Sequence, residues 1–297
     1  MLVVFAGLIY AVAGLVGSLF AASDKNVIAG QGGDGPTSPS GVAVDLSGGS
    51  STTSRGEVAA EVAATATTGI TSTTIADAGR TPTPADPARI YIAGDSDAGA
   101  FAPYLQRLLK DTGVTKLTVD YKVSTGLARP DFFDWPARLS AQIPAVNPDI
   151  VIVTFGGNDG QPIHGLSAKV DTPEWRAEYA KRVGAAMDFL SADGRTLIWV
   201  GIPNAGSPDF TGRLKIQNEV VVDQASKHPN VVFVDSWSRF SGIDGGYAEY
   251  VLDPRDGVSK PVRAKDGFHL NETGAKILAL DIANAVNAEL RNRGAAI

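Results

Sequence analysis

The stretch DIVIVTFGG, residues 149–157, is a nearly continuous apolar run that ends in two glycines. Such a run is typical of a strand whose two faces are both buried, whereas a strand with one solvent-exposed face alternates apolar and polar residues. Similar short runs predict four more strands, ARIYIAG (88–94), KLTVDYKV (116–123), RTLIWVGIP (195–203) and NVVFVDSW (230–237). The sequence therefore predicts a five-stranded sheet whose two faces are covered.

Segments with the helical spacing of apolar residues lie between and after these strands. The spacing predicts helices over residues 101–111, 134–147, 172–194, 213–228 and 271–294. Alternating strands and helices are the pattern of an α/β protein with a parallel sheet and helices on both faces. We expect residues 87–297 to form one domain of this class.

Residues 1–22 contain no charged residue and are long enough to span a bilayer as a helix. A cleaved signal peptide is the alternative, but the usual basic start is missing and the apolar run is longer than is normal for one. We therefore expect a transmembrane anchor or a signal segment. Either places the rest of the chain outside the cytoplasm, as a single-pass membrane protein or as a secreted one.

Residues 23–86 are rich in Gly, Ser, Thr, Ala and Pro, and they contain no Phe, Trp or Tyr. Without large apolar side chains a segment cannot offset the entropy cost of ordering its backbone. The composition predicts a flexible linker between the N-terminal segment and the folded domain.

The overall composition excludes several classes of function. The chain carries 26 basic and 32 acidic residues, a net charge of −6, so it lacks the basic footprint of a nucleic-acid-binding protein. It has no cysteine, which removes disulfides, thiolate metal sites and cysteine nucleophiles. Its three histidines are far apart in the sequence, so we expect no metal and no cofactor.

Small and polar residues follow the predicted strands. Ligands of an open parallel sheet bind at the carboxyl ends of the strands, so these positions are the first place to search for a site. Gly94-Asp95-Ser96 follows the first strand, Gly126 lies after the second, and Asn158 after the third. Asp266 and His269 come just before the last helix.

Among the three histidines, only His269 has an aspartate three residues earlier. A carboxylate at that offset in a turn can reach Nδ1 of the imidazole, fix its tautomer and leave Nε2 free to take a proton from a serine. Ser96 lies where a strand passes into a helix, and the free N–H groups of a helix N-terminus favour a developing negative charge.

Each of these residues also has an ordinary structural interpretation. Ser96 is a good helix cap, His269 could cap the last helix, Gly126 could serve a turn, and Asn158 could stabilise its own loop. It is their joint position at successive strand ends that favours a catalytic site.

In this order and spacing, the blocks Gly94-Asp95-Ser96, Gly126 in STGLARPDFFDW, Asn158 in GGNDGQ, and Asp266 with His269 in KDGFHLN resemble the SGNH/GDSL hydrolase superfamily. The likeness covers residues 88–294, and phrases such as RPDFFDWP and IWVGIP resemble an exported or membrane-tethered bacterial branch. The resemblance implies a flavodoxin-like three-layer α/β/α sandwich. It implies that Ser96 is the nucleophile, that Asp266 and His269 are its base, and that Ser96, Gly126 and Asn158 form the oxyanion hole.

One departure from the family pattern follows the nucleophile, where Asp97 stands in place of the usual apolar residue. A carboxylate there disfavours anionic substrates or binds a substrate hydroxyl. We expect Asp97, Arg129 and Asp159 to contact the substrate. Asp253 and Asp256 are rival partners for the histidine, less well placed than Asp266.

These observations predict a serine esterase acting on O-acyl esters, O-acetyl above all, of cell-envelope carbohydrate. An O-acyltransferase with the same triad, a lipid esterase and a non-catalytic glycan-binding domain remain as alternatives. We expect residues 236–268 to form a functional loop over the site. Six aromatic residues are candidates either for stacking on sugars or for core packing: Phe132, Phe133, Trp135, Trp175, Trp237 and Tyr247.

Overall fold

The computed structural model describes residues 79–297. The predicted membrane or signal segment at 1–22 and the linker up to residue 78 lie outside these described residues. No helix within 79–297 has the length and apolar character that crossing a membrane requires.

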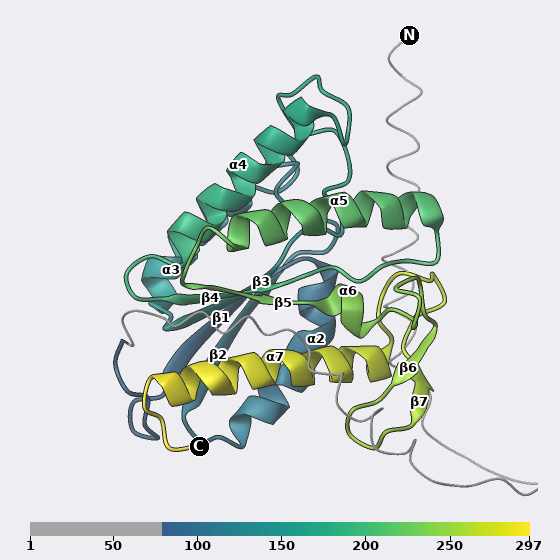
Figure 1. Ribbon diagram of the computed structural model, residues 1–297. Coiled ribbons are helices and arrows are strands. Elements are labelled where there is room, and N and C mark those ends of the chain that lie inside the picture. The colour runs from purple at the N-terminus through teal and green to yellow at the C-terminus, as the bar shows by residue number, and fades with distance from the viewer. Residues whose placement is uncertain (1–78) are drawn as a thin grey trace, which may run out of the picture. The chain divides into compact units, whose positions relative to one another are not determined.

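The centre of the domain is a parallel sheet in the order β2-β1-β3-β4-β5, which confirms the predicted five strands (Figure 1). The strands are β1 (Ala88–Gly94), β2 (Thr115–Tyr121), β3 (Ile150–Thr154), β4 (Thr196–Val200) and β5 (Val231–Val234). In the register of the sheet, Gly94 at the end of β1 pairs with Tyr121 of β2 and Thr154 of β3. The carboxyl ends of these strands therefore share one edge, where ligands are expected.

Helices cover both faces of the sheet and complete three layers (Figure 1). They are α2 (Ser96–Lys110), α3 (Trp135–Val146), α4 (Pro173–Leu190), α5 (Pro208–Ala225), the short α6 (Ser236–Arg239) and α7 (Glu272–Asn292). Helices α2 and α7 pack together on one face, while α3, α4 and α5 cover the other.

The sequence of β3 explains why two cores form. Ile150 and Ile152 belong to the apolar cluster under α2 and α7, whereas Val151 and Val153 belong to the cluster under α3, α4 and α5. Successive side chains of a strand point to opposite faces, so a continuous apolar run supplies both cores at once.

Two predicted helices begin earlier than the apolar spacing indicated. Helix α2 begins at Ser96 instead of residue 101, because the Asp95 side chain caps it by accepting a hydrogen bond from Asp97 N. Helix α5 begins at Pro208 instead of 213, where Ser207 is the cap and proline occupies the first turn. Cap residues, and not apolar spacing, set these boundaries.

The segment 236–268 carries more regular structure than a loop. It contains α6 and an antiparallel pair, β6 (Tyr250–Leu252) and β7 (Ser259–Pro261). Inside it, the buried Asp253 carboxylate accepts hydrogen bonds from Arg255 Nε at 2.7 Å and from Lys260 Nζ at 3.0 Å. Asp253 therefore ties this segment together and does not orient His269.

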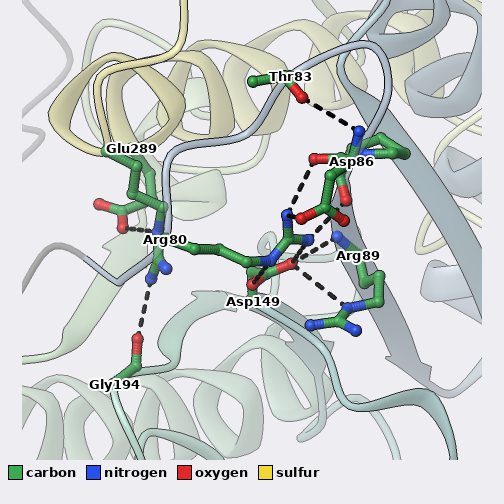
Figure 2. A network of polar contacts seen from close by, with 9 residues as sticks. Arg80, Thr83, Asp86, Arg89, Asp149, Gly194 and Glu289 are labelled. Atoms are coloured by element: carbon green, nitrogen blue, oxygen red, sulfur yellow. Dashed lines mark hydrogen bonds and ion pairs between the residues drawn. The ribbon is translucent and has the colours of Figure 1, made fainter.

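The first described residues are held by a network of polar contacts around Asp149, next to the amino end of β3 (Figure 2). Arg80 donates to both carboxylate oxygens of Asp149, at 3.1 and 2.8 Å, and to the carbonyl of Pro87 at 2.7 Å. Asp149 also accepts the N–H of Arg89 at 2.7 Å. These contacts join Arg80 to the folded domain.

Candidate active site

The turn from β1 into α2 places Ser96 at the carboxyl edge of the sheet. Gly94 has φ +155, and a side chain there would lie 2.5 Å from the carbonyl oxygen of Thr154, so only glycine fits. Asp95 is the helix cap, and Ser96 is the first helical residue. The hydroxyl is thus held beside the N–H groups that open the helix.

Ser96, His269 and Asp266 form a chain of hydrogen bonds. Ser96 Oγ lies 3.0 Å from His269 Nε2, and His269 Nδ1 lies 2.6 Å from Asp266 Oδ2. Asp266 Oδ1 accepts the backbone N–H groups of Phe268 at 2.9 Å and His269 at 3.0 Å. Since a carboxylate only accepts, Nδ1 is the donor to Asp266, and Nε2 is left to accept from the serine.

The Asp266 carboxylate is suited to remain charged. Its partial burial raises the pKa, but the hydrogen bonds from the His269 side chain and from the two backbone N–H groups outweigh burial and leave the pKa below its usual value. The other two histidines lie elsewhere. His228 Nε2 faces Asp188 at 3.1 Å, and His164 Nδ1 faces Asp131 at 3.4 Å.

Gly126 and Asn158 come together next to the serine turn. Asn158 Nδ2 donates to Asp95 Oδ2 at 3.0 Å and to the carbonyl of Thr125 at 3.1 Å. The Gly126 N–H has no acceptor within residues 79–297. A free N–H and a nearby amide are the groups from which an oxyanion hole is built. Both N–H groups of the Asn158 amide already donate to other acceptors. An oxyanion would therefore have to share one of them with the Thr125 carbonyl or displace that carbonyl.

Asp159 faces the protein and not the solvent. It is buried, and its carboxylate accepts from Leu127 N at 3.0 Å, Ala128 N at 2.8 Å and the Tyr179 hydroxyl at 3.0 Å. Burial raises its pKa, and these hydrogen bonds oppose the rise. In this arrangement Asp159 positions the loop after Gly126, whereas the sequence analysis expected it to contact the substrate.

The other two expected substrate contacts occupy different environments. Asp97 is buried; this burial raises its pKa, and the charges of His269 and Arg263 oppose the rise. Arg129 lies in a partly exposed loop and donates to both oxygens of Asp131, at 2.8 and 2.7 Å. The Asp97 carboxyl is therefore close enough to His269 for their charges to interact. The Arg129 guanidinium instead faces Asp131 in the same loop.

Comparison with known protein families shows to which family the chain belongs. Residues 89–285 match a family described as "Protein of unknown function (DUF459)". The chain belongs to this family. No curated protein shows significant similarity to it.

Solved structures supply the fold of this DUF459 domain. It superposes on an acetyl xylan esterase with a TM-score of 0.50 and 18% identity, over 67% of this chain and 99% of the other. It superposes on a GDSL-like lipase from Bacteroides thetaiotaomicron with a TM-score of 0.50 and 14% identity, over 68% and 88% of the two chains. The DUF459 domain thus has the SGNH/GDSL hydrolase fold that its sequence motifs predicted.

Arg263 is a residue of the DUF459 site that the sequence analysis missed. It is buried, and it donates to Asn204 Oδ1 at 2.8 Å and to the carbonyls of Phe240 at 2.9 Å, Phe268 at 3.2 Å and Ala248 at 3.2 Å. Burial lowers its pKa to about 10. Arg263 joins the loop that carries Asp266 and His269 to three other segments. A single arginine in KPVRAKDG carries no sequence signal for this role.

The aromatic candidates of the DUF459 domain fall into three groups. Trp135 and Trp175 are fully buried, and their indole N–H groups bond Thr125 Oγ1 at 2.8 Å and the Gln161 carbonyl at 2.9 Å, so they belong to the core. Phe133 and Trp237 are partly buried against apolar clusters. Phe132 and Tyr247 remain exposed.

Proposed function

We propose that this protein is a serine esterase that removes O-acyl groups, chiefly O-acetyl groups, from carbohydrate. The observation that carries the proposal is the chain from Ser96 through His269 to Asp266, with separations of 3.0 and 2.6 Å. A nucleophile in contact with a base, and the base in contact with an orienting carboxylate, is the arrangement that acyl transfer needs.

The reaction would proceed through an acyl-enzyme. Ser96 Oγ attacks the ester carbonyl, and its proton passes to His269 Nε2, while Asp266 stabilises the imidazolium. His269 then gives the proton to the departing alcohol oxygen as the carbon–oxygen bond breaks. In the second half, His269 takes a proton from water as the water oxygen attacks the acyl carbon. The proton then returns to Ser96 Oγ as its bond to the acyl carbon breaks, and the carboxylic acid leaves and ionises in solvent.

The negative oxygen of each tetrahedral intermediate needs donors in place beforehand. The N–H groups of Ser96 and Gly126 and the amide of Asn158 are the donors available at this edge of the sheet. Loss of one such donor typically costs about 2.7–4 kcal/mol of transition-state stabilisation.

Two considerations favour carbohydrate esters as substrates. One solved structure of the same fold is an acetyl xylan esterase, which makes sugar-bound acetyl groups the first class to test. The Asp97 carboxyl next to the nucleophile in the sequence also makes the site less apolar, which favours short acyl groups such as acetyl over long chains. We place the reaction outside the cytoplasm, since the apolar residues 1–22 predict export or anchoring.

The test is release of acetate from O-acetylated polysaccharides, with labelling by a fluorophosphonate probe as the second readout. Wild type should release acetate and label, whereas Ser96→Ala and His269→Ala should lose at least roughly 10³-fold in rate and should not label. A wild-type protein that neither labels nor cleaves any short ester would refute the esterase and favour the glycan-binding alternative. Transfer of the acetyl group to a sugar hydroxyl in preference to water would instead establish the acyltransferase.

A further inference from the structure

Tyr247 is an exposed aromatic residue that lies beside the loop from Asp266 to His269. A Cβ on Gly267 would lie 3.6 Å from the Tyr247 hydroxyl, and a Cβ on Gly206 would lie 3.5 Å from its ring. Gly206 N donates to the Gly267 carbonyl at 2.9 Å, so both glycines belong to one hydrogen-bonded unit. Gly267 is two residues from His269, and the ring therefore borders the proposed active site.

The protein holds this ring in a fixed place. The backbone of Ser241 bridges to Tyr247, and Gly242 N donates to the Gly246 carbonyl at 2.9 Å across the turn between them. The guanidinium of Arg263 lies 5.2 Å from the centre of the ring and covers one of its faces. Since Arg263 is itself anchored by its hydrogen bonds to neighbouring segments, the ring is organised before any ligand arrives.

Tyr247 keeps accessible surface, since 38% of the residue is exposed although Arg263 covers one side of its ring. Phe268 differs in this respect: its ring packs against Phe210, with centroids 4.8 Å apart, and against the imidazole of His269, also at 4.8 Å. Phe268 is thus packed between Phe210 and His269, whereas part of Tyr247 remains exposed.

We propose that Tyr247 is a binding platform for the sugar ring that carries the ester, an inference that rests on the proposed function. The face of an aromatic ring is electron-rich and attracts the weakly positive C–H groups on one side of a pyranose. The negative charges of the exposed Asp244 and Asp266 and the positive charge of Arg263 lie around the ring, so the surroundings favour a sugar without net charge. The ligand class is therefore a neutral pyranose that bears an acyl ester.

The experiment compares Tyr247→Ala with Tyr250→Ala, a matched change on β6, where the tyrosine is 57% exposed. Each variant is assayed on p-nitrophenyl acetate and on O-acetylated xylo-, cello- and chito-oligosaccharides. For Tyr247→Ala, kcat/KM on at least one oligosaccharide should fall about tenfold more than on p-nitrophenyl acetate, with the loss in KM. Tyr247→Phe and Tyr247→Trp should restore kcat/KM on that oligosaccharide. Tyr250→Ala should leave kcat/KM unchanged on both kinds of substrate.

Two outcomes overturn the platform. Equal losses on both kinds of substrate would mean that Tyr247 only supports Arg263 and the catalytic loop. The absence of any loss on all three oligosaccharides would mean that no sugar stacks there.

A binding measurement separates this inference from the esterase proposal. Calorimetry of Ser96→Ala with the same oligosaccharides, bare and acetylated, is repeated after Tyr247→Ala is added. Weaker binding in the double variant supports the platform even if wild type cleaves no ester. Unchanged binding of every sugar to the double variant rejects the platform even if wild type is an active esterase.

Discussion

Asp95 Oδ2 accepts a hydrogen bond from the side-chain amide of Asn158 at 3.0 Å, across 63 residues of sequence. The other oxygen of the same carboxylate accepts Asp97 N at 3.0 Å and so caps the helix that begins with Ser96. Asp95 is buried, and no basic side chain pairs with it in the described part of the chain. One carboxylate therefore sets both the serine turn and the direction of the amide proposed to hold the oxyanion.

The first prediction concerns this double role. Asp95→Asn keeps the shape of the side chain but offers one acceptor where the carboxylate offers two, so either the helix cap or the Asn158 amide loses its partner. We expect kcat to fall roughly 10²–10³-fold, the cost of one oxyanion donor, with little change in KM. The measurement is steady-state kinetics on p-nitrophenyl acetate.

Asp149→Asn is the matched control, since this buried carboxylate also accepts a backbone N–H but lies at the opposite edge of the sheet. It should lower stability and leave kcat unaffected. A similar fall in kcat for both variants would show that Asp95 contributes only to folding.

The second prediction is a pH profile. The pKa of Asp266 is held below its usual value by hydrogen bonds from His269 and the backbone, so this carboxylate stays charged above pH 4. The imidazole accepts the serine proton only when it is neutral. Thus kcat/KM should rise with pH and reach a plateau once the base has lost its proton. A flat profile would exclude His269 as the base, and Asp266→Asn should lower kcat about 10⁴-fold because it permits the wrong tautomer.

The sequence indicated the sheet and the Asp266–His269 pair because both depend on local patterns. Apolar runs mark β3 and β4, and the three-residue offset of Asp266 from His269 is visible without a structure. The roles of Asp159 and Arg263 depend on partners far along the chain. Asp159 binds N–H groups more than 30 residues away, and Arg263 binds an amide 59 residues away. No spacing rule indicates such contacts, so only the folded chain shows them.

The third prediction concerns Arg263. Arg263→Lys keeps the positive charge but cannot reach the four acceptors of the guanidinium, so buried carbonyls lose their partners. We expect a loss of about 2 kcal/mol in the free energy of unfolding and a lower kcat, because the Phe268 carbonyl is next to His269. Urea unfolding measures the first effect.

Arg129→Lys is the control, since it alters a partly exposed arginine that pairs with Asp131. It should change stability by less than about 1 kcal/mol. Equal effects from the two variants would contradict the structural role of Arg263.

The fourth prediction is a substitution at Asp97 that raises stability, whereas most substitutions lower it. Burial raises the pKa of Asp97, so the folded chain holds this proton more tightly than the unfolded chain. Its contribution to stability is therefore most favourable in acid and is lost as pH rises through the raised pKa. Asp97→Asn should raise the melting temperature at pH 8, and the gain should vanish near pH 4. A destabilised variant at pH 8 would show that the charged form is required by Arg263 or His269.

The last prediction tests how tightly Asp159 and Gly126 are fitted together. A Cβ at Gly126 would lie 2.1 Å from Asp159 Oδ1, far closer than atoms can approach, so Gly126→Ala must push the loop away from the carboxylate. We expect loss of the Gly126 donor and a fall of kcat by about 10²–10³-fold. The double variant Gly126→Ala/Asp159→Gly removes the collision but leaves Leu127 N and Ala128 N without their acceptor. It should therefore recover no activity, whereas recovery would show that Asp159 limits space and does not position the loop.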